Sequence, residues 1–409
     1  MTILGNIAHI LVFPFPAQGH MIPLLDLSHQ LATHGLTITI LITPKNLPLL
    51  NPLLSKHPSI KTLVLPFPAH SSIPDGVENC KDLHSNSSVV IMMHALGELY
   101  NPLLDWFHNH PSPPVAIISD MFLGWTHKLA CEIGIRPIVF SPSGALALSV
   151  IFALWRDMPR LNHVRDRNQL VKFPKIPNSP KYPLWQVSPM YRSYVEGDPI
   201  SEFIKDGFLG DIGSWGLVIN SFTELERVYL DHLAKQMDSR VWAVGPLLPS
   251  AEETTERGGS SSVSGEYIIS WLDTCQDQKV VYVCFGSQSV LTNDQMDKLA
   301  LGLEKRIAAG VAMLAWPMGA DQFVNAGLLV DELKVAKLVC EGAKTVPDST
   351  ELARVVAESV SSENRVMELR EEAIKAIEKS GTSVKDLEGL IKHLAGLELE
   401  KENNLIIEM

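Results

Sequence analysis

Short apolar runs alternate with helical patterns along the first half of the chain. The runs at residues 7–15, 36–43 and 115–119 are mostly apolar or β-branched, as strands buried on both faces of a parallel sheet are. After the first and third runs, at 21–35 and 122–134, apolar residues recur every three or four positions. Strands that alternate with helices predict a parallel sheet with helices on both of its faces.

The same rhythm continues at 136–144 and 216–226, and a strand-like run at 241–249 closes this half. We therefore predict an N-terminal Rossmann-like domain over residues 1–248. A linker is expected at 249–265, because the stretch AEETTERGGSSSVSG has no apolar periodicity and a Gly/Ser core.

After the linker the rhythm of strands and helices restarts. Helical patterns at 267–275 and 293–305 flank an apolar run at 279–287, which we expect to be a strand that ends in a Gly-Ser turn. Another strand is expected at 311–317, and from Thr350 onward the pattern is mostly that of amphipathic helices.

These patterns predict an α/β protein with two Rossmann-like domains that face each other across a cleft. The second domain would span residues 266–395, followed by a C-terminal tail at 396–409. The length of 409 residues agrees with two domains, because a single core stops growing near roughly 250–300 residues. In such sheets, ligands bind where the loops at the carboxyl ends of the strands converge.

Composition narrows the possible partners. The net charge of −12 argues against nucleic acid and anionic membranes, because both attract basic surfaces. The five cysteines include no C-x-x-C pair, which is typical of a reduced chain in the cytoplasm. The start lacks the basic region of a signal peptide, and the longest apolar run, at 145–155, is shorter than the roughly 20 residues of a membrane span. We expect a cytoplasmic monomer that acts on small molecules.

Several signature motifs are missing from the sequence. It contains no G-x-G of a dinucleotide site, no G-x-x-x-x-G-K-[ST] phosphate loop and no G-x-S-x-G elbow of a serine hydrolase. Its 14 histidines form no H-E-x-x-H motif and no cluster with the spacing of zinc ligands.

Two ionisable side chains follow predicted strands. His20 comes after the first strand, in FPFPAQGHMIPLL, and Asp120 directly follows the run at 115–119. A neutral imidazole can accept a proton near pH 7, and a buried carboxylate on its other nitrogen would fix its tautomer. The alternative is structural: His20 caps or packs against the following helix, and Asp120, which precedes FLGW, is a helix N-cap. The spacing alone favours neither interpretation.

A further candidate site lies in AGVAMLAWPMGADQFVNA, at residues 309–326. Here a loop after a predicted strand delivers Asp321 and Gln322 to the start of a helix. A carboxylate accepts hydrogen bonds and an amide both donates and accepts, so this pair suits sugar hydroxyls. An ordinary capped helix start would explain the same residues.

Six stretches follow one another along the chain: FPFPAQGHMIPLL, IISDMFLGW, VINSFTELE, VGPL, VVYVCFGSQSVLT and AGVAMLAWPMGADQFVNA. In this order they resemble motifs of the plant family 1 UDP-glycosyltransferases. The resemblance covers nearly the whole chain. Together with GAKTVPDSTELA near the end, the residues of these motifs are most similar to those of the flavonol 7-O-glycosyltransferase branch and its relatives that glucosylate phenolics. The resemblance implies the GT-B fold.

The resemblance also implies an inverting mechanism without metal or cofactor. His20 would be the general base that takes a proton from the acceptor hydroxyl, and Asp120 would orient and balance it. The resulting oxygen would attack the anomeric carbon of a UDP-sugar from the face opposite UDP. Gly19, beside His20, would contact the acceptor, in a pocket that the N-terminal half shapes.

On the donor side, the resemblance implies that Ser287 lies near the diphosphate and uridine. Asp321 and Gln322 would hold the sugar hydroxyls. In this family a Gln at the second position goes with UDP-glucose, which is therefore the expected co-substrate.

One part of the family pattern is absent. The donor-binding box normally runs from Trp-x-Pro-Gln through His-Cys-Gly-Trp-Asn-Ser to the Asp-Gln pair, but here GLEKR runs directly into IAAGVAMLAWPM. Several dozen residues are missing between Arg306 and Ile307, and with them strand–helix units of the second sheet. In relatives this part stacks the uracil on a tryptophan and holds the diphosphate at a helix N-terminus. The sequence therefore predicts a second domain that is truncated internally.

Three interpretations follow. The chain is an active enzyme that transfers glucose to a phenolic hydroxyl. Alternatively, it binds the acceptor but cannot hold a UDP-sugar. In the third, it is the nonfunctional product of a splice form or a mispredicted gene.

Overall fold

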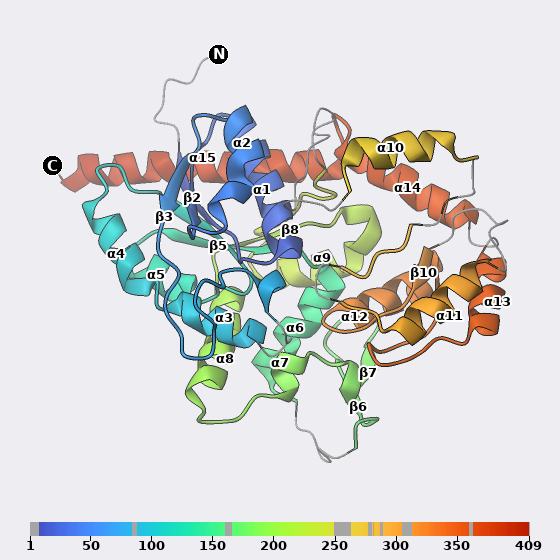
Figure 1. Ribbon diagram of the computed structural model, residues 1–409. Coiled ribbons are helices and arrows are strands. Elements are labelled where there is room, and N and C mark those ends of the chain that lie inside the picture. The colour runs from blue at the N-terminus through green and yellow to red at the C-terminus, as the bar shows by residue number, and fades with distance from the viewer. Residues whose placement is uncertain are drawn as a thin grey trace.

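The computed structural model describes residues 8–83, 88–159, 166–248, 263–276, 280, 282–286, 289–304, 313–359 and 363–408. Its first half forms a seven-stranded sheet in the order β3-β2-β1-β4-β5-β8-β9, and all six strand pairs are parallel. The strands are β1 (His9–Phe13), β2 (Thr37–Ile42), β3 (Lys61–Val64), β4 (Ala116–Asp120), β5 (Arg136–Ser141), β8 (Gly216–Ile219) and β9 (Val241–Ala243). The parallel α/β architecture predicted from the sequence is confirmed (Figure 1).

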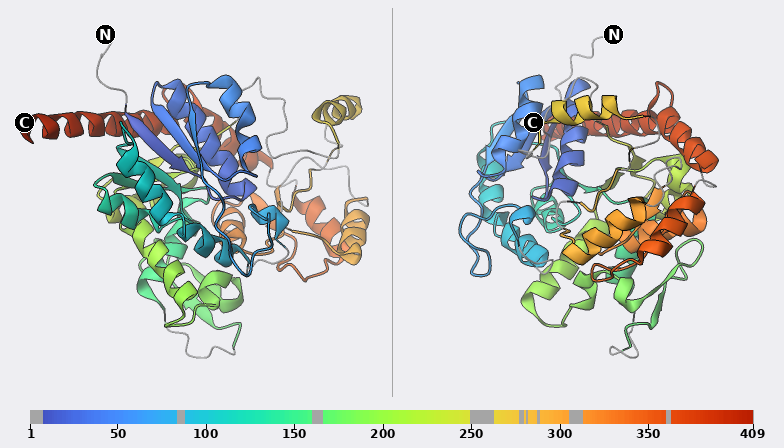
Figure 2. Two further views of the ribbon diagram at one scale, coloured as in Figure 1. Left: turned by 60° about the vertical axis from the view of Figure 1, so that its left-hand side comes forward. Right: turned by 45° about the vertical axis from the view of Figure 1, so that its right-hand side comes forward.

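Both faces of this sheet are buried, which explains why its strands read as nearly continuous apolar runs. In β1, Leu11 and Phe13 join one hydrophobic core, while Ile10 and Val12 join the core on the opposite face. Figure 2 shows helices on the two sides of the sheet.

The helices of the first half divide between the two cores. The first core is covered by α3 (Ser88–Gly97), α4 (Tyr100–Asn109), α5 (Thr126–Glu132), α6 (Ala145–Asp157), α8 (Pro199–Ile212) and α9 (Thr223–Gln236). The second core is covered by α1 (Gln18–Thr33) and α2 (Asn51–Lys56). A small antiparallel hairpin of β6 (Leu170–Lys172) and β7 (Lys181–Pro183) precedes η3 (Leu184–Gln186) and α7 (Pro189–Arg192).

The second half is smaller and mostly helical among the residues that the structure describes. Its sheet has two parallel strands, β10 (Met313–Ala315) and β11 (Ala336–Leu338). Its helices are α10 (Gly265–Thr274), α11 (Asn293–Glu304), α12 (Gln322–Gly327), η4 (Leu328–Glu332), α13 (Ser349–Ser359) and α14 (Glu363–Ile377). The predicted helices at 267–275 and 293–305 are thus confirmed.

The strand expected at 279–287 is wrong for its described residues. Residues 280 and 282–286 belong to no strand, and Tyr282 is 87% exposed. An apolar run becomes a strand only where a neighbouring strand pairs with its backbone groups. In the described part of the second half, β10 and β11 pair only with each other, so the run has no strand paired with it.

The last helix, α15 (Thr382–Glu408), returns to the first domain (Figure 1). Leu390 and Leu394 are fully buried and belong to the same core as Trp242 of β9. Asp386 accepts a hydrogen bond of 2.9 Å from the backbone N–H of Ala243. The division of the chain at 248, 265 and 395 stays a prediction, and this packing ties the part of α15 from Leu387 to Leu397 to the first sheet.

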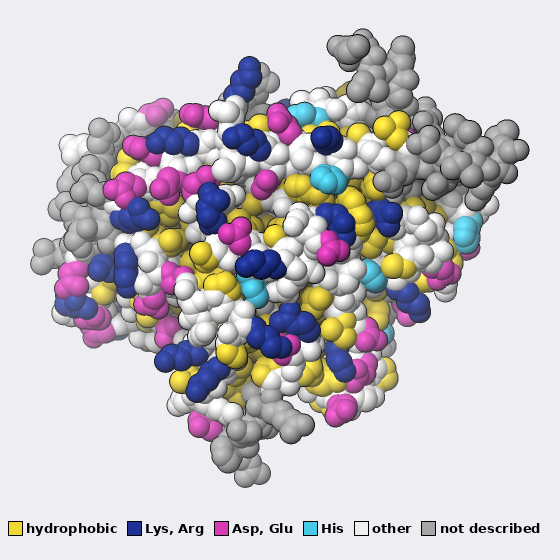
Figure 3. Space-filling view, turned by 180° about the vertical axis from the view of Figure 1, so that it is seen from behind, with side chains coloured by type: hydrophobic (Ala, Val, Ile, Leu, Met, Phe, Trp, Pro, Cys, Tyr) yellow, Lys and Arg dark blue, Asp and Glu magenta, His cyan; other side chains and the backbone are white. Residues whose placement is uncertain are grey.

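The surface carries charges of both signs. Lysine and arginine side chains are interspersed with aspartate and glutamate over the face in Figure 3. Because positive and negative side chains alternate, this face has no large region of one charge. Among the described residues, no helix combines the length and apolar character that a membrane crossing requires.

Candidate functional site

His20 lies at the carboxyl end of β1, on the first turn of α1. Prolines 14 and 16 end the strand, and the helix begins two residues later. The backbone N–H groups of His20 and Met21 donate to the carbonyl of Ala17, at 3.0 and 2.8 Å. This tight turn presents the imidazole beyond the edge of the sheet, as expected from the sequence.

Asp120 is the last residue of β4, which pairs with β1, and its carboxylate is fully buried. The Nδ1 atom of His20 lies 2.9 Å from Oδ2 and 3.1 Å from Oδ1 of Asp120. The backbone N–H of Phe122 donates a further hydrogen bond of 2.9 Å to Oδ1. The structural alternative for Asp120 fails, because α5 begins only at Thr126.

The surroundings of His20 favour the protonated ring. Burial by itself lowers the pKa of His20, but the charge and hydrogen bond of Asp120 and the charge of Asp321 outweigh it, so the pKa is raised. The rings of Phe15 and Phe122 lie 5.7 and 4.5 Å from the imidazole, centroid to centroid. An imidazolium formed here is therefore stabilised by a buried carboxylate and lies between aromatic rings.

The contact with Asp120 also decides which ring nitrogen can act. Because Nδ1 donates to the carboxylate, the lone pair of the neutral ring is on Nε2. The His20 side chain keeps 19% of its surface exposed, while Asp120 has none. The arrangement can therefore accept a proton from a bound molecule at Nε2.

Asp321 and Gln322 lie together at the start of α12, and both side chains are engaged within the protein. Oδ2 of Asp321 accepts hydrogen bonds from Oγ of Ser143, at 2.7 Å, and from Nδ2 of Asn325, at 3.0 Å. Oε1 of Gln322 accepts the backbone N–H of Met318 at 2.8 Å. Their role toward a sugar stays a prediction.

Ser143 is a residue of this region that sequence reasoning missed. It follows β5 in the SPSG turn, where no periodic pattern marks it. Its contact with Asp321 joins the first domain to the loop of the second, and Asp321 is near enough to His20 to raise its pKa. The catalytic candidates and the predicted sugar ligand Asp321 are therefore brought to one region.

The two remaining sequence candidates contribute less. Ser287 lies outside the described residues. Gly19 is exposed beside His20, and a Cβ added to it would meet no atom within 4 Å. Open space next to Gly19 is compatible with a ligand there, but its role as an acceptor contact stays a prediction.

Other contacts hold α12, η4 and the loop after β11 against the first domain. The hydroxyl of Tyr229 donates to Glu332, with Oε1 at 2.6 Å and Oε2 at 2.7 Å. The amide of Gln186 donates to Glu341 at 2.8 Å, and the rings of Trp185 and Phe323 lie 5.1 Å apart.

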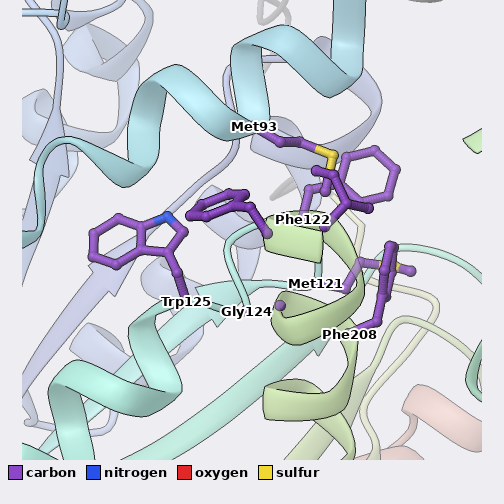
Figure 4. A pocket seen from close by; sticks show the side chains of 9 residues that line it. Met93, Met121, Phe122, Gly124, Trp125 and Phe208 are labelled. Carbon is purple, nitrogen blue, oxygen red and sulfur yellow. The ribbon is translucent and has the colours of Figure 1, made fainter. Parts of the chain in front are cut away.

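A narrow apolar crevice lies next to the candidate base (Figure 4). Its side chains pack so closely that it has no room for a water molecule. Its walls come from α3, α8 and the turn after β4, and they consist of Met93, Met121, Phe122, Gly124, Trp125, Phe203, Ile204, Gly207 and Phe208. Phe122 belongs both to this crevice and to the aromatic surroundings of His20. Within the described ranges, no group of three or more histidine, cysteine or carboxylate side chains could hold a metal ion.

Known proteins resemble this chain in both sequence and fold. No family model matches the sequence. The chain is 53% identical to UDP-glycosyltransferase 89B2 of Stevia rebaudiana, with 95% of this chain and 98% of the relative covered. It is 47% identical to the flavonol 3-O-glucosyltransferase UGT89B1 of Arabidopsis thaliana, with 96% and 97% covered.

The crystal structure of Arabidopsis thaliana UGT89C1 complexed with UDP-L-rhamnose superposes with a TM-score of 0.79 at 33% identity, covering 96% of this chain and all of that one. The same protein has been solved complexed with quercetin, with a TM-score of 0.77. The fold is thus the GT-B fold of these enzymes. The alignment with the Stevia protein runs over 463 positions, against 409 residues here, so some of its positions are occupied by no residue of this chain. With such identity over nearly its whole length, the chain belongs to the plant UDP-glycosyltransferases.

Proposed function

We propose that this chain transfers a hexose from a UDP-sugar to a hydroxyl of a small, flavonoid-like phenolic acceptor, with inversion at the anomeric carbon. The observation that carries the proposal is the contact of 2.9 Å between His20 and the fully buried Asp120. Relatives named as flavonol glycosyltransferases, and the related structure solved with quercetin, support a flavonoid-like acceptor.

In the proposed reaction, the proton of the acceptor hydroxyl passes to Nε2 of His20. The negative charge of Asp120 stabilises the imidazolium that forms, because its oxygens stay hydrogen-bonded to Nδ1. The acceptor oxygen forms a bond to the anomeric carbon as the bond from that carbon to UDP breaks. UDP leaves with the electron pair, and the proton later returns from His20 to solvent.

We propose UDP-glucose as the donor, with Ser287 near its diphosphate and Asp321 and Gln322 on its sugar hydroxyls. The engagement of Asp321 with Ser143 implies that a bound sugar displaces or joins this hydrogen bond. The relatives include a flavonol 3-O-glucosyltransferase and a flavonol 7-O-rhamnosyltransferase, so UDP-rhamnose is the donor to compare with UDP-glucose. Gly19 would border the acceptor.

A second candidate function is binding of the acceptor without transfer. It is favoured by the small second sheet, with two strands among the described residues, and by the alignment positions that this chain leaves empty. The donor box missing between Arg306 and Ile307 would account for both. This junction lies outside the described residues, and the internal truncation stays part of the proposal. A donor site without these elements would lose several charge-assisted hydrogen bonds, at about 1.5–3 kcal/mol each.

One experiment separates the two functions. Calorimetric titration of the purified chain with UDP-glucose, UDP-rhamnose and quercetin gives each affinity, and product analysis by mass spectrometry gives transfer. Transfer of a hexose supports the enzyme. Binding of quercetin, with UDP-sugar binding no tighter than millimolar and no product, supports the acceptor-binding protein. The absence of any binding, with a broad and uncooperative melt, would favour a nonfunctional product.

We further propose that the protein works as a cytoplasmic monomer, without metal, cofactor, nucleic acid or membrane. The net charge of −12 and the lack of paired cysteine motifs support this setting. Transfer unaffected by EDTA, and a hydrodynamic size that fits one chain, are the expected results.

A further inference from the structure

Two buried asparagines lie beside the turn that leads into the candidate base. Asn46 follows β2, and Asn79 lies directly before η2 (Cys80–Asp82); the two residues are 2% and 3% exposed. Nδ2 of Asn79 donates a hydrogen bond of 2.7 Å to Oδ1 of Asn46. Amide groups removed from water cost free energy unless they are hydrogen-bonded, so a buried pair of this kind fixes the two segments that carry it.

Every polar atom of the Asn46 side chain has a partner. Its Nδ2 donates to Oγ1 of Thr43, at 2.9 Å, and to the carbonyl of Glu78, at 2.8 Å, while its Oδ1 accepts from Asn79. Oδ1 of Asn79 in turn accepts the backbone N–H of Lys81 at 3.1 Å. Two side chains therefore tie this loop to the end of β2.

Cys80 connects the loop to the turn after β1. Its backbone N–H donates a hydrogen bond of 2.8 Å to the carbonyl of Pro16. This carbonyl shares one planar peptide unit with the N–H of Ala17. The carbonyl of Ala17 accepts the N–H groups of His20 and Met21, with which α1 begins. The position of Pro16 therefore sets the position of the helical turn that carries His20.

The turn after β1 needs such an external partner. Pro14 and Pro16 have no backbone N–H, so the turn can make few hydrogen bonds of its own. The N–H of Ala17 bonds to the carbonyl of Phe15 at 2.8 Å, and the N–H of Cys80 comes from a loop more than 60 positions away. Without the bond from Cys80, the carbonyl of Pro16 would lose its backbone donor.

The side chain of Cys80 lies close to the other member of the His20–Asp120 pair. Burial, together with the charge of Asp120, raises the pKa of the Cys80 thiol to about 12, so the thiol is neutral and feels that charge. Cys80 is 1% exposed and belongs to the same core as Phe15, whose ring lies 5.7 Å from that of His20. A displacement of the Cys80 loop would therefore disturb the contact between His20 and Asp120.

We propose that Asn79 is a positioning residue for His20 in the transfer reaction. Together with Asn46, it fixes the backbone N–H of Cys80, and this N–H holds the turn from which His20 reaches the acceptor. The inference rests on the proposed function, since it takes His20 as the base. Asn79 takes no part in a chemical step, and it acts through the direction in which Nε2 of His20 points.

The test follows the ring protons of His20 by NMR in the full chain, because their midpoint reports the contact with Asp120 without requiring transfer. Asn79→Ser keeps a hydroxyl that can accept the N–H of Lys81 but is too short to reach Asn46. We expect the midpoint to fall toward the ordinary value of 6.5, because a displaced ring loses part of the contact that raises its pKa. Asn46→Ala should give the same shift, and the double variant should add little, since the two residues act as one unit.

Kinetics give a second readout. Small displacements of a reacting group can cost about 10²-fold in rate, so kcat of Asn79→Ser should fall about 10- to 100-fold. The calorimetric affinity for quercetin should change by less than about twofold, because only the direction of the base is altered. Leu394→Ala is the control for stability: it truncates a buried side chain of α15, and it should leave the midpoint and kcat unchanged.

Hydrogen exchange in the unmodified chain guards against variants that fail to fold. The backbone N–H of Cys80 should exchange about as slowly as that of Met21, because both are bonded to the same turn. Rapid exchange at Cys80 would overturn the proposal, and so would an unchanged midpoint in folded Asn79→Ser and Asn46→Ala. A lowered midpoint in both variants, with no transfer by the wild type, would support the positioning of His20 and refute the proposed function.

Discussion

The hydroxyl of Ser143 donates a hydrogen bond of 2.7 Å to Oδ2 of Asp321. The two residues are 178 positions apart and belong to the end of β5 and the start of α12. This bond brings a carboxylate of the second half toward the histidine of the first, where its charge raises the pKa of His20. The proton affinity of the candidate base is thus set from both halves of the chain.

Replacing His20 by alanine should abolish most transfer. A positioned base contributes about 10²–10⁴-fold in rate, so kcat should fall by that amount while the calorimetric affinity for the acceptor changes little. His34→Ala is the matched control, since His34 is exposed at the other end of the same helix. Unchanged turnover in His20→Ala would refute the role of the base.

Asp120→Asn should lower the pKa of the His20 ring. The folded-state pKa is raised above 6.5 with Asp120 ionised, and the amide removes both the charge and the strong acceptor. Burial, which opposes protonation, would then dominate. Titration of the ring protons by NMR should give a midpoint above pH 6.5 in the wild type and a lower one in the variant. Transfer, which needs the neutral ring, should start at lower pH but with a reduced maximum.

The raised pKa of His20 also makes the stability of the fold depend on pH, in a definite direction. Because folding raises the pKa of His20, this residue stabilises the fold at pH values below the unfolded pKa. The contribution is lost as pH rises through the folded value. The difference in unfolding free energy between the wild type and Asp120→Asn should therefore shrink as pH rises above 6.5, as followed by urea denaturation. A difference that grows with pH over this range would contradict the assignment.

Asp321→Asn should shift the same NMR midpoint downward by less than Asp120→Asn does. Asp321 acts on His20 through its charge alone, whereas Asp120 adds a direct hydrogen bond. Ser143→Ala, which removes the partner of Asp321 but no charge, is the control and should move the midpoint least. If Asp321→Asn leaves the midpoint unchanged, the two side chains do not share one region in solution.

Glu226→Ala should destabilise the first domain. The buried carboxylate of Glu226 accepts the backbone N–H groups of Ala145 and Leu146, both at 2.9 Å, at the start of α6. It also accepts the hydroxyl of Ser221, at 2.5 Å. Each buried donor left unsatisfied costs about 1–3 kcal/mol, so urea denaturation should show a loss of about 3 kcal/mol or more. The exposed neighbour Arg227, changed to alanine, should have little effect.

Leu394→Ala tests whether α15 belongs to the first core. The side chain is fully buried with Trp242, so its truncation should cost about 2–5 kcal/mol. Glu388→Ala, on the exposed side of the same helix, is the control. A loss below about 1 kcal/mol would mean that the helix is not packed on the sheet in solution.

The sequence predicts the first sheet well because both of its faces are buried. Strands such as β1 and β8 carry apolar residues at nearly every position, and the helical periods between the strands are clear. The same logic fails at Tyr282, where the apolar pattern is present but the neighbouring strands are not. A strand depends on partners that its own residues cannot reveal.

Only part of the candidate site could be predicted from the sequence, for a related reason. A strand end predicts where His20 and Asp120 emerge, but their contact depends on β1 and β4 being neighbours. Ser143 carries no local pattern at all. Its importance arises from its contact with Asp321, and only the folded chain brings these two segments together.

The position of α15 gives the second domain the status of an insert within the first. The chain departs after β9, and at Thr382 it comes back to the very strand from which it departed. A deletion between β9 and Thr382 would shorten the inserted segment and would remove nothing from the core around Trp242 and Leu390. Since the entropy of closing such a loop varies only slowly with its length, the histidine and its carboxylate can keep their scaffold through large changes in the second half.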